Sequence, residues 1–200
     1  MKKSRFRGFF AVVIAFAMLL SVLAMLAPIV RADTEPNNDF DQAELITPGT
    51  YTGSLHDTDD PNDYYKILIS AGQSLSANVT PAATLAIELR FYNPAKMEVA
   101  YEYGYQGVIV KLSWTTNSAQ PSYTYYIRVT AWTGYGAYSL GVSLTSQNDA
   151  NSGGDAGDSL DTPTQIVSAN ATYSGFLKNL DEDDYYKLNI MAGQTLSVTV

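Results

Sequence analysis

The sequence predicts an all-β protein, a jelly-roll-like β-sandwich of about eight strands followed by a partial second copy of the same module. Three observations predict this class. Fifteen Tyr against seven Phe and two Trp favour strands, where a tyrosine ring packs and its hydroxyl stays hydrated. Short apolar or alternating runs are separated by Gly, Pro, Asn and Asp, which are the residues of turns. A stretch of the first half recurs in order in the second half, which indicates a duplicated domain.

Eight runs in the first copy have the length and spacing of strands. They cover residues 51–55, 63–70, 74–80, 85–92, 97–103, 107–114, 123–132 and 136–144. No amphipathic helix of roughly ten residues or more is expected after residue 32. Short strands in this number favour a sandwich over a barrel.

The repeat is clearest where the motif DYYK, starting at Asp63, returns with its following AGQ turn starting at Asp184. We therefore expect a complete module at 33–145, a linker rich in Ser, Asn and Gly at 146–154, and a truncated second copy at 155–200. Too few strands remain in the second copy to bury a core, so the chain is interpreted as a fragment of a longer protein, the alternative being a C-terminal end that does not pack.

The first 32 residues have the features of an export signal. Four basic residues lie within the first seven positions, an apolar run spans 9–26, and the expected cleavage position follows Ala32. Because the apolar run approaches a membrane-spanning length, an uncleaved N-terminal anchor is the alternative. In both cases the rest of the chain is expected to be secreted or at the cell surface, with a membrane contacted only through an uncleaved leader.

Charge is distributed unevenly along the chain. Five of the twelve Lys and Arg residues and none of the twenty Asp and Glu residues lie in the leader, which leaves 7 − 20 = −13 from Asp33 onward. This acidity argues against nucleic acid or an anionic membrane surface as a partner. Because the chain has no Cys, a metal ion is the cross-link still available to an exported domain, and the acidity favours calcium.

Acidic and amide residues concentrate at 33–39 (DTEPNND) and at 57–63 (DTDDPND) of the first copy. Calcium binds about six to eight oxygen ligands, and alternate residues of an extended segment project to one side, where they can face one ion. The second segment can reach the same ion from a turn. Five residues are therefore predicted as calcium ligands: Asp33, Glu35, Asn37, Asp60 and Asp63. The alternative is that both segments are ordinary solvated turns.

The second copy has acidic residues at equivalent places, and these are Asp155, Asp158, Asp181 and Asp184. Because two loops stay acidic in both copies, the residues alone support a calcium site about as well as they support polar turns. However, Gly153 and Gly157 stand where the first copy has Asp33 and Asn37, so the second site is the less well supplied with oxygens.

Together these motifs resemble the bacterial pre-peptidase C-terminal domain, a group that includes the collagen-binding domains of clostridial collagenases. The matching motifs are Asp33-x-Glu35-Pro36-Asn37-Asn38, Gly53, Asp60-x-x-Asp63-Tyr64-Tyr65 and Ala71-Gly72-Gln73. The resemblance covers nearly all of the first copy and the surviving part of the second. It implies a non-catalytic jelly-roll module, appended to secreted peptidases and other exported proteins, in which calcium clamps the N-terminal segment onto the sheet. It assigns metal contact to the five predicted ligands, with Asn38 and Asp39 as further oxygens.

Aromatic residues supply a second candidate site, for which Tyr103, Trp132 and Tyr135 are the named residues. An aromatic face binds polysaccharides or extended peptides well. The alternative is that these rings belong to the core or pack on neighbouring strands.

No catalytic residue is predicted. The single histidine, His56, excludes a two-histidine zinc site, and the sequence has no nucleophile elbow, phosphate loop or dinucleotide motif. The chain is therefore expected to be a calcium-binding accessory or adhesion module that binds an extracellular protein or polysaccharide polymer, or spaces other domains. An N-terminal fragment of a secreted peptidase and a carbohydrate-binding module are the alternatives.

Overall fold

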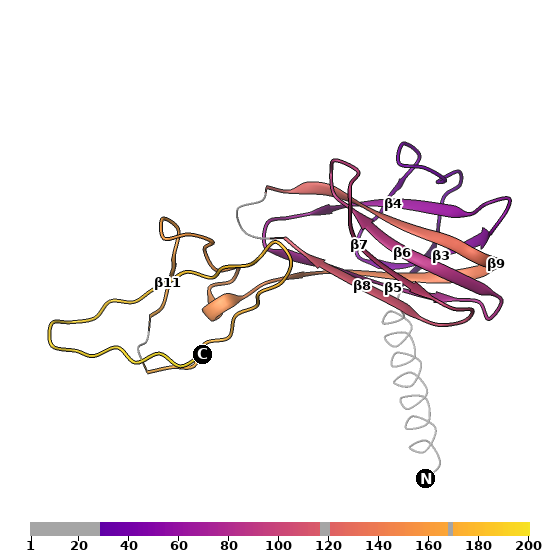
Figure 1. Ribbon diagram of the computed structural model, residues 1–200. Helices are drawn as coiled ribbons and strands as arrows, with labels where there is room; N and C mark the ends of the chain where they lie inside the picture. The colour runs from indigo at the N-terminus through magenta and orange to yellow at the C-terminus, as the bar shows by residue number, and fades with distance from the viewer. Residues whose placement is uncertain (1–28, 117–120, 168–169) are drawn as a thin grey trace, which may run out of the picture. The chain divides into compact units, whose positions relative to one another are not determined.

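The computed structural model describes residues 29–116, 121–167 and 170–200 (Figure 1). Residues 31–200 form one compact unit. The predicted export leader lies outside the described residues except for its last four positions. In the part of the chain that the structure describes, no helix is long and apolar enough to cross a membrane.

The part of the chain predicted as the first copy folds into two sheets that share one long strand, β9 (Tyr123–Ser146) (Figure 1). The first sheet has the order β1–β3–β9–β5–β8, and its other strands are β1 (Val30–Ala32), β3 (Gly49–His56), β5 (Gln73–Pro81) and β8 (Val110–Thr115). The second sheet has the order β2–β4–β9–β6–β7, with β2 (Glu44–Leu45), β4 (Asn62–Ile69), β6 (Leu85–Tyr92) and β7 (Glu98–Gly104). The predicted all-β sandwich is confirmed.

Strand β9 passes from one sheet to the other without interruption. Its first half pairs with β4 and β6, and its second half pairs with β3 and β5. Gly134, at the crossing, has φ +88°, and a Cβ there would overlap the carbonyl oxygen of Thr84. Only glycine combines this backbone conformation with so close an approach.

The expected strands agree with the observed ones to within a few residues, apart from the last two. The runs at 123–132 and 136–144 are one bent strand rather than a hairpin. Glycine between two alternating runs predicts a turn, but here it allows a bend at which pairing continues on both sides.

Both sheets contribute alternate side chains to one core. Leu75, Val79 and Leu140 come from the first sheet, and Ile87 and Ile127 come from the second, all at 0% exposure. The outward positions between them are polar or aromatic, as the period of two in a strand requires. This rigid frame fixes the strand ends at which the acidic residues lie.

The described part of the predicted second copy has a strand pairing like the one that surrounds these acidic residues. Strand β10 (Thr164–Gln165) pairs in parallel with β11 (Tyr186–Lys187), as β2 pairs with β4 in the first copy. The linker contains a short 3₁₀ turn, η1 (Asp149–Asn151). Many apolar side chains of this copy are exposed, for example Val167 and Met191.

Candidate metal centre

Three of the predicted ligands form one acidic cluster, which we call the first cluster: Asp33, Glu35 and Asp63. One carboxylate oxygen of each lies within 4.8 Å of the others. Two backbone hydrogen bonds hold the N-terminal segment in place, because Asp33 N–H donates to Thr52 O (2.9 Å) and Tyr64 N–H donates to Asn37 O (2.7 Å). The segment is thereby fastened to both β3 and β4.

The side-chain amide of Asn37 is fully buried against this cluster. With its nitrogen turned toward the cluster, it donates to Glu35 Oε2 at 3.2 Å and to Asp63 Oδ1 at 2.9 Å. In the opposite orientation its oxygen faces the same two carboxylates. The first orientation suits the cluster without a cation and the second suits a bound cation, because an amide oxygen is a calcium ligand.

The other predicted ligand, Asp60, lies at the side of the first cluster and outside the group of mutually close oxygens. With its nitrogen turned toward them, the Asn38 amide donates to Asp60 Oδ1 at 3.0 Å and to the Asn62 carbonyl oxygen at 3.3 Å, and in the opposite orientation its oxygen faces Asp60. Asp39 Oδ1 instead accepts the N–H groups of the next turn, at 2.8 and 2.9 Å. Asp60 and Asn38 can therefore complete a coordination shell, whereas Asp39 holds the turn.

A hydrogen-bonded chain of two tyrosines joins Asp63 to Asp33. The Tyr138 hydroxyl donates to Asp63 Oδ2, the Tyr65 hydroxyl donates to Asp33 Oδ2 at 3.2 Å, and the two hydroxyls contact each other. If both carboxylates are ionised, each tyrosine hydroxyl donates its proton to a carboxylate. No proton is then left to form a hydrogen bond between the two hydroxyls. A proton on Asp63 supplies the missing hydrogen bond. Asp63 then donates to Tyr138, Tyr138 donates to Tyr65, and Tyr65 donates to Asp33.

Electrostatics agree with this proton count. Burial raises the pKa of Asp63, the hydrogen bond from Tyr138 lowers it, and the like charges of Asp33, Glu35 and Asp60 raise it, which together give a pKa of about 8. Burial, and then the charge of Asp60, also raise the pKa of Glu35. None of the ion pairs found among the described residues involves the first cluster.

This arrangement fits a divalent cation with oxygen ligands. Three carboxylates, one buried amide and a flanking carboxylate provide hard donors in the number and irregular geometry that calcium accepts. A cation would remove the repulsion among the carboxylates and displace the proton from Asp63. The cluster offers neither histidine nor cysteine, which zinc prefers.

We expect the chain without calcium to lose stability as the pH rises. The carboxyl of Asp63 has its ordinary pKa of 3.8 when unfolded and a pKa of about 8 when folded, so the folded state holds the extra proton between these values. The stabilisation is complete below about pH 4 and is lost as the pH rises through about 8. Thermal melts in chelator at pH 5, 7 and 9 should therefore show falling melting temperatures, and saturating calcium should remove most of this fall. A chelated chain that is equally stable at pH 5 and 9 would contradict the raised pKa.

The residues predicted for the second copy also come together, and the structure adds one that sequence reasoning missed. Asp155, Asp158 and Asp181 form one group of close oxygens, and Asp149, Asp155 and Asp184 form another. We call these five residues the second cluster. Asp149 belongs to the linker, where alignment of the copies places no metal ligand, because η1 replaces the extended segment of the first copy.

Two of the predicted ligand-binding aromatics lie in one exposed patch, and the third does not. The aromatic patch consists of Tyr101, Tyr103, Tyr105 and Trp132, which line a shallow hollow together with Glu88. The ring of Tyr103 lies 6.0 Å from that of Trp132 and 6.2 Å from that of Tyr105. Tyr135 stacks on His56 instead, at 5.5 Å. The patch residues are about half exposed or more, so they do not form the core.

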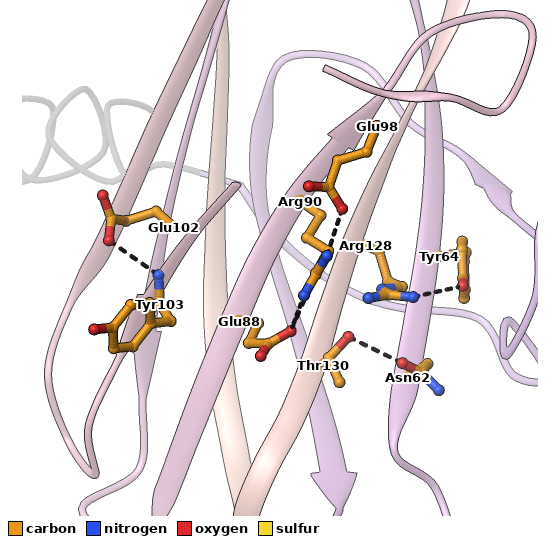
Figure 2. A network of polar contacts seen from close by, with 9 residues as sticks. All are labelled: Asn62, Tyr64, Glu88, Arg90, Glu98, Glu102, Tyr103, Arg128 and Thr130. Atoms are coloured by element: carbon orange, nitrogen blue, oxygen red, sulfur yellow. Dashed lines mark hydrogen bonds and ion pairs between the residues drawn. The ribbon is translucent and has the colours of Figure 1, made fainter. Parts of the chain in front are cut away.

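Polar side chains continue the outer face of the second sheet beside this patch (Figure 2). Arg90 on β6 lies between Glu88 and Glu98 and pairs with both, as Figure 2 shows. On the neighbouring strands, Arg128 donates to the Tyr64 hydroxyl at 3.3 Å. The Arg90 guanidinium also lies 5.5 Å from the centre of the Tyr101 ring. Fixed donors and acceptors thus lie next to exposed rings.

Comparison with known proteins finds no matching family model and no matching curated protein. Among solved structures, the chain is similar to the pre-peptidase C-terminal domain of collagenase from Bacillus anthracis, with 21% identity over 56% of this chain and 100% of that chain, and a TM-score of 0.44. It is also similar to PliG, a periplasmic inhibitor of g-type lysozyme from Aeromonas hydrophila, with 13% identity over 58% of this chain and 100% of that chain, and a TM-score of 0.40. A CBM4 structure matches with 10% identity over 47% of this chain and 81% of that chain, and a TM-score of 0.32. These likenesses are too distant to carry residue roles to this chain.

Proposed function

We propose that this chain is a non-catalytic, calcium-binding accessory module of an exported or cell-surface protein, of the pre-peptidase C-terminal type and repeated in tandem. The first cluster carries the proposal. Asp63 and Asn37 are both fully buried, and they face Asp33 and Glu35 with no basic side chain paired to the cluster among the described residues. Buried carboxylates in such a group need a cation or protons to be stable.

Calcium at the first cluster would act as a clamp. Asp33 and Glu35 belong to the N-terminal segment, whereas Asp63 is the second residue of β4. A cation that binds all three carboxylates joins the segment to the sheet by bonds stronger than the two backbone hydrogen bonds alone. The module would then be stiff in an environment that supplies calcium.

Terbium luminescence tests the metal site without reference to any activity. Terbium binds in calcium sites, and its emission rises when a nearby tyrosine transfers energy to it. Tyr65 and Tyr138 contact two of the proposed ligands, so we expect strong tyrosine-sensitised emission that calcium removes by competition. Emission no stronger than that of free terbium would count against the site.

The aromatic patch supports binding of a polysaccharide by the same module. Exposed rings stack on the apolar faces of sugars, and the fixed charges of Glu88 and Arg90 can bond sugar hydroxyls. The patch lies on β7, the residues after it and β9, whereas the first cluster lies where the N-terminal segment is fastened to β3 and to the start of β4. Calcium would therefore stabilise the module and the patch would bind the polymer.

We expect Trp132→Ala and Tyr103→Ala to weaken binding to insoluble polysaccharide by about tenfold each, because each removes a ring from the patch. Tyr135→Ala is the matched control, since Tyr135 is equally aromatic and exposed but stacks on His56 outside the patch. Pull-down on a panel of polysaccharides and on collagen measures the effect. Equal binding by all three variants, or capture by collagen alone, would contradict a carbohydrate site at the patch.

A further inference from the structure

The second cluster is built on the same backbone frame as the first. Ala150 N–H donates to Ser174 O at 2.8 Å, as Asp33 N–H donates to Thr52 O. Likewise, Tyr185 N–H donates to Gly157 O at 2.8 Å, as Tyr64 N–H donates to Asn37 O. The linker turn η1 therefore stands where the N-terminal segment stands in the first copy.

Asp149 fills the gap that the sequence repeat leaves at Gly153. Asp149 is only 2% exposed, and one of its carboxylate oxygens lies within 4.8 Å of those of Asp155 and Asp184. Its Oδ2 also accepts the Ala156 N–H at 3.2 Å, which fixes the carboxylate toward the cluster. The linker thus supplies the acidic residue that the second copy lacks at the equivalent sequence position.

Two buried carboxylate oxygens in this cluster have no hydrogen-bond partner among the described residues. Asp181 is fully buried; its Oδ2 accepts from the Gln147 amide, and its Oδ1 has no hydrogen-bond partner among the described residues. Asp184 is similar, because its Oδ2 accepts from Tyr186 at 2.9 Å and its Oδ1 is buried without such a partner. An unsatisfied buried carboxylate oxygen is costly, and a cation removes this cost.

We propose that the second cluster is a second divalent-cation site of the calcium class, in which Asp149 brings the linker into the coordination shell. This inference uses the chemistry of the proposed function but none of the residues of the first cluster. The five carboxylates are Asp149, Asp155, Asp158, Asp181 and Asp184.

A cation at this site would also join the two copies. Gln147 donates its side-chain amide to Asp181 and its backbone N–H to Gly72 O at 3.2 Å, so it connects the AGQ turn of the first copy to a proposed ligand. Asn179 Oδ1 accepts the Thr115 N–H at the end of β8, at 3.2 Å. Occupation of the site therefore holds the linker and the loop before Asp184 together and restrains the junction of the modules.

Calorimetric titration of calcium into the metal-free full chain tests the proposal by stoichiometry. We expect two equivalents for the native chain, one for Asp149→Asn, and one for Asp63→Asn, which leaves the second cluster intact. Asp161→Asn is the matched control, because Asp161 is an exposed acid of the second copy outside both clusters, and it should keep two equivalents. Asp155→Asn should repeat the result of Asp149→Asn if the latter variant fails to fold.

The outcomes separate the two sites. One equivalent in the native chain that Asp63→Asn removes would overturn the second site and leave the proposed function standing. One equivalent that Asp149→Asn removes and Asp63→Asn keeps would support the second site and reject the first. Limited proteolysis adds a readout without variants: calcium should slow cleavage within 146–154 by about tenfold or more, and an unchanged rate would overturn the role of the linker.

Discussion

Replacing Asp63 with asparagine is expected to abolish calcium stabilisation at the first cluster while leaving the metal-free fold almost unchanged. The carboxyl of Asp63 has a pKa of about 8 and is therefore mostly protonated at pH 7 without metal. Asparagine is equally neutral and has nearly the same shape, and its NH2 group can donate to the Tyr138 hydroxyl as the protonated carboxyl does. It cannot provide the negative charge that a cation requires, so the stabilisation of about 2.7 kcal/mol expected at 100 times Kd should be lost.

Thermal unfolding of the native chain and of the variant in calcium and in chelator measures this effect. Asp59→Asn is the matched control, because Asp59 is an exposed acid of the same loop and bonds only the neighbouring Thr58 among its described contacts. The control should respond to calcium as the native chain does. A full calcium response in Asp63→Asn, or an equal loss in Asp59→Asn, would contradict the assignment of Asp63.

The second large effect is expected for Gly53→Ala, a change of one methyl group. A Cβ at Gly53 would overlap Asp33 Oδ2 and would lie 2.5 Å from the Tyr138 hydroxyl, so the hydrogen-bonded chain between the carboxylates must move. Overpacking of this kind costs about 2–3 kcal/mol, which corresponds to about 10 °C or more in melting temperature. The variant should also bind calcium at the first cluster at least about tenfold more weakly, because Asp33 is displaced.

Gly154→Ala provides the matched control for this substitution. A Cβ at Gly154 meets no atom within 4 Å, and Gly154 has no positive φ, so alanine should be tolerated there. Thermal melts and terbium titration of both variants give the comparison. Native stability in Gly53→Ala would mean that the close approach of β3 to Asp33 is unimportant.

Most of the fold could be predicted from the sequence because strand periodicity and turn residues are local signals. Prediction was wrong where a residue has two structural uses. Gly134 is typical of a turn, but close approach of Thr84 makes it the bend of a single strand, and only the completed sandwich decides between these uses. The break expected between the last two strands is therefore absent.

The candidate site could be predicted in part for the same reason. Alternate spacing indicates that Asp33 and Glu35 face one ion, and the structure brings them together with Asp63. Asp149 could not be found by aligning the copies, because it reaches the second cluster through a turn of different length. The role of Tyr65 was missed, although its recurrence as Tyr186 beside a repeated acid was a usable signal.

The aromatic residues show a further limit of sequence reasoning. Alternation along β7 places Tyr101 and Tyr103 on one face but does not say whether that face is core or surface. Trp132 reaches them from β9 across β6, which lies between the two strands, and its ring contacts that of Tyr103. Tyr135, three residues after Trp132, lies beyond the bend at Gly134 and so reaches His56 instead.

The melting temperature of the native chain in saturating calcium, compared with that in chelator at pH 7 to 8, tests most directly whether calcium holds this module together. A cation bound by buried carboxylates predicts an increase of about 10 °C, which should be reversed when chelator is added back. Identical melting temperatures in calcium and in chelator would contradict a calcium-stiffened module.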